Sequence, residues 1–170
     1  MNKYILLLGI LSELVFSQSE CDGDRYISDI FPDVQLTSNI EYGENITVNI
    51  FGTEYLQTLY LDVYEPVSDN FNERPLIIFL FGGAFVSGSK TSSVMQELCT
   101  RYARMGYVAS AIDYRLTPTL VWDGTEENAY TAALRAIHDL KAAIRYFRMN
   151  DMLYDDFGID TSRIYVGGSS

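Results

Sequence analysis

The sequence LIIFLFGGAFVSGSK, from Leu76 to Lys90, decides the fold of this chain. Its first six residues are apolar, and Pro75 and Gly82 bound them. Six residues are too few for an independent helix, so the run predicts a strand that is buried on both faces. The turn that follows begins with Gly82, Gly83 and Ala84. Because these residues have so little side-chain bulk, their backbone N–H groups can approach a ligand closely, and such groups favour an anion.

Strand and helix patterns alternate around this run. Strands are predicted over residues 45–51, 57–64, 76–81, 107–112 and 163–166, and helices over residues 92–105 and 129–148. The first two strands alternate apolar and polar residues, so we expect them to pair antiparallel. From residue 76 onward, the order strand, helix, strand, helix, strand is typical of a parallel sheet with crossover helices. This order places the fold in the α/β class.

The longer predicted helix carries apolar residues at steps of four and three. We expect its buried stripe to be formed by Ala133, Ile137, Leu140, Ile144 and Phe147.

The composition fits one ordinary domain with a buried core, since 48% of the 170 residues are hydrophobic. The net charge is −11, from 12 Lys and Arg against 23 Asp and Glu. No basic cluster stands out beyond the polar face of the longer helix, so nucleic acid is not an expected partner. No cluster of metal-binding residues is apparent either, and we expect neither a metal nor a cofactor.

The first twenty residues are typical of a secretory signal peptide. Lys3 supplies a positive charge, residues 5–11 form an apolar segment, and Ser17 and Ser19 lie in a zone suited to cleavage. An apolar run this short favours a cleaved signal over the alternative, an uncleaved anchor. We therefore expect a secreted or otherwise exported protein without stable membrane association, in which residues 21–170 form the mature domain.

Two cysteines, Cys21 and Cys99, occur in the chain. In an exported protein an even number of cysteines makes a disulfide plausible. The alternative is that Cys99, on the predicted helix 92–105, is a buried thiol that packs like a small hydrophobic residue. The sequence leaves both interpretations open.

Three motifs together resemble the α/β-hydrolase fold, and within it the carboxylesterase and lipase group that carries an HGGG-type loop. The motifs are FGGAFVSGSK, GYVASAIDYRL and GIDTSRIYVGGSS, and they occur in the order typical of that fold. The resemblance covers the chain from about residue 40 to its end. It implies a mostly parallel sheet with flanking helices. In this fold the catalytic acid and histidine follow the nucleophile, so the resemblance implies a partial domain, truncated after the nucleophile elbow.

By this resemblance, the backbone N–H groups of Gly83 and Ala84 form part of an oxyanion hole, and Gly82 sets the turn. Phe81 stands where much of the family has His, and Ala84 where many members have Gly, but neither change removes a backbone donor. The alternatives are a plain glycine-rich turn or a phosphate-binding loop. No GK[ST] sequence follows, which argues against a nucleotide site.

The elbow motif G-x-S-x-G can be read in two registers at the end of the chain. Ser170 is the nucleophile in one and Ser169 in the other. The resemblance favours Ser170, because relatives often read GGSSAG at this point. The composition of GGSS also fits a flexible linker. Its position directly after the predicted strand 163–166 favours the elbow.

The resemblance implies a serine carboxylesterase that acts on small-molecule esters through an acyl-enzyme. The only histidine, His138, lies upstream on the longer helix, where we expect a structural boundary residue and not the general base. Asp113 and Arg115 match the family's DYR segment and are likewise expected to be structural. Without a base, the chain alone should show no appreciable turnover. A serine peptidase of the same fold and a catalytically inactive binding module remain as alternatives.

Overall fold

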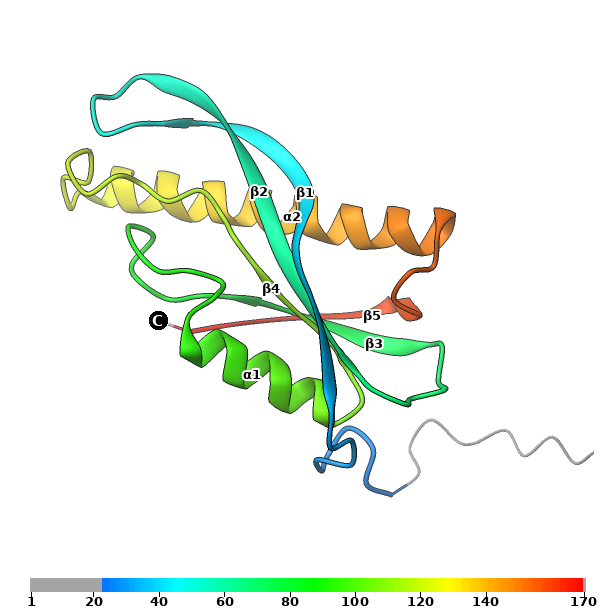
Figure 1. Ribbon diagram of the computed structural model, residues 1–170. Helices are drawn as coiled ribbons and strands as arrows, with labels where there is room; N and C mark the ends of the chain where they lie inside the picture. The colour runs from blue at the N-terminus through cyan, green and yellow to red at the C-terminus, as the bar shows by residue number, and fades with distance from the viewer. Residues whose placement is uncertain (1–22, 170) are drawn as a thin grey trace, which may run out of the picture.

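The computed structural model describes residues 23–169. The predicted signal peptide (residues 1–20), Cys21 and Ser170 lie outside the described residues. The described chain forms one five-stranded sheet with two long helices packed against it (Figure 1). In chain order the elements are β1 (Val34–Val48), β2 (Glu54–Pro66), β3 (Arg74–Leu80), α1 (Ser93–Arg104), β4 (Val108–Ile112), α2 (Glu126–Leu153) and β5 (Ile159–Gly168).

The order of strands in the sheet is β1-β2-β4-β3-β5. Strand β2 pairs antiparallel with both β1 and β4, whereas β3 pairs parallel with both β4 and β5. The predicted antiparallel pair and the predicted parallel strands are therefore confirmed, and the described sheet as a whole is mixed. Strand β1 begins well before the predicted strand 45–51 and ends at Val48, whereas β2 and β5 are longer at both ends than the predicted strands 57–64 and 163–166.

Strand β3 is buried on both faces, as its apolar run predicts. Leu76 and Ile78 pack in the cluster that includes Phe147 of α2. Ile77 and Phe79 point to the other face and pack in the cluster that includes Met95 of α1. Since alternate residues of a strand point to opposite faces, the two helices cover opposite sides of the sheet around β3.

The predicted buried stripe of α2 is confirmed in part, because Phe147 is buried and Leu140 and Ile144 pack against the same core cluster. The buried residues of this helix are Ala132, Ala136, Asp139, Ala143, Phe147 and Asn150. Ile137, which we expected in the core, is 44% exposed. The helix is turned so that Asp139 reaches Arg115, which is buried beside it. A buried carboxylate and small alanines thus occupy most of the buried face, where the spacing of apolar residues predicted larger side chains.

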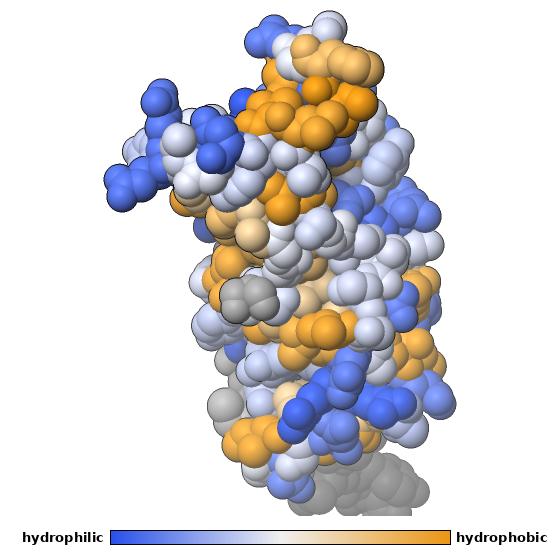
Figure 2. All heavy atoms as spheres, turned by 90° about the vertical axis from the view of Figure 1, so that its left-hand side faces the viewer, coloured by the Kyte–Doolittle hydropathy of each residue, from blue (hydrophilic) through white to orange (hydrophobic). Residues whose placement is uncertain are grey.

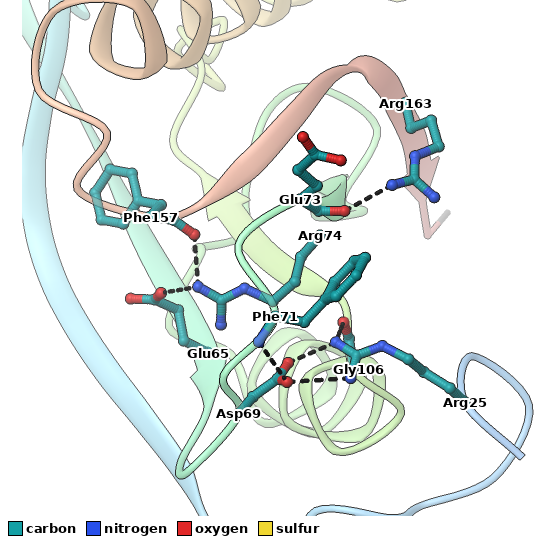
Figure 3. Close-up of polar contacts among 9 residues, drawn as sticks. All are labelled: Arg25, Glu65, Asp69, Phe71, Glu73, Arg74, Gly106, Phe157 and Arg163. Atoms are coloured by element: carbon teal, nitrogen blue, oxygen red, sulfur yellow. Dashed lines mark hydrogen bonds and ion pairs between the residues drawn. The ribbon is translucent and has the colours of Figure 1, made fainter. Parts of the chain in front are cut away.

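A polar cluster closes the end of the sheet where β3 begins (Figure 3). Arg74, the first residue of β3, donates hydrogen bonds to the Glu65 carboxylate at 2.9 Å and to the Phe157 carbonyl at 2.6 Å. Arg25 in the N-terminal arm donates to both carboxylate oxygens of Asp69. These contacts tie segments that are distant in sequence to the loop between β2 and β3. The glycine turn follows the opposite end of β3, and the candidate site lies at that end.

Cys99 is a free and fully buried thiol on α1. This placement agrees with the interpretation of a small packed side chain, while its candidate partner Cys21 lies outside the described residues. Burial raises the pKa of the Cys99 thiol to about 12. We therefore expect Cys99 to be unreactive toward an aromatic disulfide reagent at pH 8 in the native protein and to react fully in denaturant. Rapid native labelling at Cys99 would contradict this burial.

Among the helices of residues 23–169, none combines the length and apolar character needed to cross a membrane.

Candidate active site

The glycine turn after β3 has a strained backbone. Gly83 has a φ of 134°, and the next two residues, Ala84 and Phe85, have φ angles of 50° and 62°. Left-handed conformations cost L-amino acids roughly 1–2 kcal/mol per residue. The turn closes on itself through the Gly83 carbonyl, which accepts hydrogen bonds from the N–H groups of Val86 at 3.0 Å and Ser87 at 3.2 Å. Two consecutive non-glycine residues in this region indicate that surrounding contacts hold the turn in place.

Only glycine fits at position 83. A Cβ atom added there would lie 2.2 Å from the Ser87 carbonyl oxygen and 2.8 Å from its carbonyl carbon. Both atoms belong to the backbone of the same turn, so they cannot move away without opening it. The backbone of Ser87 therefore already occupies the space that a side chain at position 83 would need.

We expect the substitution Gly83→Ala to lower kcat for ester hydrolysis about 100-fold, because the added methyl group displaces the amides that the family resemblance assigns to an oxyanion hole. Steady-state kinetics on the protein expressed at its natural length would measure the loss. Gly52→Ala, at a hairpin position where a Cβ meets nothing within 4 Å, is the matched control. Equal kinetics for the two variants would contradict the role given to Gly83.

The end of β5 lies beside this turn. Ser169 donates its backbone N–H to the Leu80 carbonyl at 3.2 Å. Its side-chain Oγ in turn accepts a hydrogen bond from the N–H of Gly82 at 3.0 Å. Parallel pairing of β3 and β5 brings their carboxyl ends together, and this pairing ends at Leu80 and Gly168. The structure thus places the predicted elbow and the predicted oxyanion turn in direct contact, although they are 87 residues apart.

The backbone N–H groups of Gly83 and Ala84 have no acceptor among the described residues. Ala84 is exposed and Gly83 is half-buried. Ser170, the favoured nucleophile, lies outside the described residues, but it directly follows the serine that contacts Gly82. Two donors without a partner in residues 23–169, directly after the amide that contacts Ser169, form an arrangement that can bind a developing oxyanion.

Lys90 anchors the far end of the turn, a role that the sequence did not reveal. Its ammonium group is buried and donates hydrogen bonds to Asp62 at 2.6 Å and to Asn39 at 3.0 Å. The backbone N–H of Asn39 donates to the same Asp62 oxygen at 2.8 Å. The only available signal was the charged Asp62 on the polar side of an alternating strand. Such a residue is ordinarily assigned to the wet face of a strand.

Arg115 and His138 take the structural positions that we expected. Arg115 is buried and contacts both carboxylate oxygens of Asp139 through its Nε atom, at 3.0 and 2.9 Å. It also donates to the Ile46 carbonyl at 2.8 Å, which links the β1–β2 hairpin to α2. His138 is exposed on α2.

Asp113 directly follows β4, and its backbone takes part in holding this end of the sheet. Its carbonyl accepts a hydrogen bond from the Tyr42 hydroxyl, and its N–H donates to the Tyr60 carbonyl at 2.8 Å. Burial raises the pKa of the Asp113 carboxyl, and the nearby Lys90 opposes that shift.

A depression of about 520 Å³ lies between the hairpin and the segment after β4. Its walls are mixed: apolar and aromatic side chains such as Val48, Tyr55, Phe81 and Tyr114 lie beside the polar residues Gln57, Asp113, Thr117 and Thr119. Figure 2 views the face on which β5 ends and shows apolar side chains gathered at its top, over the hairpin. In the loop between β1 and β2, Ile50 is 51% and Phe51 84% exposed.

In residues 23–169 no cluster of three or more His, Cys, Asp or Glu could hold a metal ion.

The fold is that of the α/β-hydrolase esterases. Residues 61–170 match the model of the BD-FAE family, and the chain belongs to that family. It is 36% identical to esterase LipC of Mycobacterium tuberculosis over 110 residues, which make up 65% of this chain and 24% of that protein. It is 29% identical to neutral cholesterol ester hydrolase 1 of Mus musculus over 102 residues, which cover 58% of this chain and 22% of that protein.

Solved esterase structures share the same architecture. Thermogutta terrifontis esterase 2 phosphorylated by paraoxon superposes with a TM-score of 0.55 at 25% identity, covering 81% of this chain and 44% of the other. The same esterase with propionate bound gives a TM-score of 0.53 at 27% identity, covering 75% and 42%. The chain thus spans about a quarter of the length of the curated relatives it matches and less than half of the solved chains.

Proposed function

We propose that the protein hydrolyses small-molecule carboxylic esters by a serine mechanism that passes through an acyl-enzyme. The observation that carries this proposal is the contact between the Gly82 N–H and Ser169 Oγ at 3.0 Å. It joins the end of the elbow strand to the glycine turn, as an esterase site requires. The family membership and the ester-hydrolysing relatives support the same reaction class.

Ser170 is the proposed nucleophile, and Ser169 is the alternative in the other register. Attack of the serine oxygen on the ester carbonyl moves negative charge onto the carbonyl oxygen. The amides of Gly83 and Ala84 are the proposed donors to that oxygen, with a further donor from the residue after the nucleophile. Loss of one such donor typically costs about 3 kcal/mol of transition-state stabilisation. Backbone donors held by a closed turn do not reorganise during the reaction, which is the physical advantage of this arrangement.

The general base and the acid are proposed to come from outside residues 1–170. His138 is the only histidine in these residues, and it is exposed on α2. A serine hydroxyl without an adjacent base is a weak nucleophile at neutral pH. We therefore expect residues 1–170 alone to show no appreciable turnover.

The export of the protein, inferred from residues 1–20, is also a proposal, and N-terminal sequencing of the protein from its native source would test it.

A fluorophosphonate probe tests the serine mechanism directly, because it labels only activated serines. The protein at its natural length should be labelled on the peptide that contains Ser169 and Ser170, and labelling should abolish cleavage of a short-chain nitrophenyl ester. A matched anilide substrate should be cleaved far more slowly. Anilide cleavage at the ester rate would indicate a peptidase instead. Absence of both labelling and turnover would indicate a binding module.

A further inference from the structure

The peptide group between Phe81 and Gly82 faces two hydrogen-bonding partners at once. Its N–H belongs to Gly82 and donates to Ser169 Oγ at 3.0 Å. Its carbonyl belongs to Phe81 and accepts a hydrogen bond from the Tyr114 hydroxyl at 2.7 Å. Because the peptide unit is planar, fixing the direction of its C=O also fixes the direction of its N–H. The Tyr114 hydroxyl, the peptide and the Ser169 hydroxyl thus form one continuous chain of hydrogen bonds.

Tyr114 also packs against both ends of the strained turn. Its ring stacks on Phe81, with centroids 4.4 Å apart and an interplanar angle of 22°. It meets the Phe85 ring edge-on at 6.2 Å. The neighbouring segment adds a third restraint, because the backbone N–H of Thr117 donates to the Phe85 carbonyl at 2.8 Å. The residues between these contacts are those whose amides are proposed to bind the oxyanion.

We propose that Tyr114 is a positioning residue, whose hydroxyl orients and polarises the Phe81–Gly82 peptide so that the Gly82 N–H points at Ser169. Hydrogen bonds in a chain polarise one another, so a donor on the carbonyl strengthens the N–H as a donor. Tyr114 is only 3% exposed, which protects this chain from competition by water. Burial also raises the pKa of the phenol, so it keeps its proton across the neutral range.

The catalytic consequence rests on the proposed function. A peptide that rotates away from Ser169 changes how the turn presents the next two amides, those of Gly83 and Ala84. Binding of a neutral ester depends little on these amides, whereas the charged transition state depends on them strongly. Loss of the Tyr114 hydroxyl should therefore lower kcat and leave KM nearly unchanged.

The test compares Tyr114→Phe with Tyr64→Phe in the protein at its natural length. Tyr64 is a buried tyrosine of β2, so its substitution is the matched control for the loss of a buried hydroxyl. We expect Tyr114→Phe to lower kcat about tenfold, with KM changed less than about twofold. Its affinity for a trifluoromethyl ketone, which forms a charged tetrahedral adduct, should fall by the same factor. Tyr64→Phe should change neither kcat nor that affinity. A kcat for Tyr114→Phe equal to that of the control would overturn the proposal.

A second readout separates this proposal from the proposed function. The Gly82 nitrogen shares electrons with the Phe81 carbonyl by resonance, so its NMR chemical shift reports the hydrogen bond to that carbonyl. With glycine labelled by ¹⁵N, Gly82 should show the largest shift change of all glycines in Tyr114→Phe and little change in Tyr64→Phe. An unchanged Gly82 signal would overturn the positioning role. A wild-type protein without esterase activity would refute the proposed function, and the Gly82 signal would still decide the role of Tyr114.

Discussion

Replacing Ser170 with alanine is expected to lower kcat for ester hydrolysis by about 10⁴-fold to 10⁶-fold, because it removes the proposed nucleophile. The proposed oxyanion donors remain in place, so a small residual rate should persist. Substrate binding involves other groups, and KM should change little. Hydrolysis of a chromogenic short-chain ester by the protein at its natural length would measure both constants, with the burst of the first turnover as a check on acylation.

The two registers of the elbow give different outcomes for neighbouring variants. If Ser170 is the nucleophile, Ser169→Ala removes only the acceptor of the Gly82 N–H and should cost about tenfold. The reverse ranking, in which Ser169→Ala is the more severe change, would assign the nucleophile to Ser169. Ser162→Ala, which replaces an exposed serine within β5, is the control for serine replacement. His138→Ala should leave kcat unchanged, and a large loss would identify His138 as the base.

The second large effect concerns stability. Asp139→Ala should lower the free energy of unfolding by about 3–5 kcal/mol, because it leaves the Arg115 guanidinium buried without its counter-charge. The side chains of Arg115 and Asp139 are 7% and 0% exposed. Asp139 also accepts the backbone N–H of Arg115 at 2.9 Å, which would lose its partner as well. For a domain of this size, the loss corresponds to a fall in the melting temperature of roughly 10 °C.

Chemical denaturation of the same protein would check this value, with Glu97→Ala as the control. Glu97 is an exposed carboxylate on α1, and its removal should change stability by less than about 0.5 kcal/mol. The double variant with Arg115→Met and Asp139→Leu should lose less than Asp139→Ala, because it leaves no buried charge unpaired. If Asp139→Ala is as stable as the control, the pair does not hold the segment after β4 to α2.

Much of the fold could be predicted from local patterns. The apolar run of β3 between Pro75 and Gly82 fixed a buried strand and a tight turn, and Ser92 and Gly106 bounded α1 correctly. The candidate site could be outlined from the sequence, because the glycine turn and the two serines at residues 169 and 170 belong to recognisable motifs. The residue on which the buried face of α2 is centred could not be predicted. Its spacing of apolar residues pointed to Ile137, whereas the helix buries Asp139 against an arginine 24 residues away.

The sequence by itself determined the elements that depend on neighbouring residues: which segments form strands or helices, where the chain must turn, and which serines and amides are candidates for the proposed chemistry. Only the tertiary structure decided the pairings between distant residues, namely Gly82 with Ser169, Tyr114 with Phe81, and Lys90 with Asp62. The physical reason is that strand and helix periodicity act over a few residues and can be read along the chain. A buried polar group instead needs one specific partner, and the folding of the whole sheet chooses it.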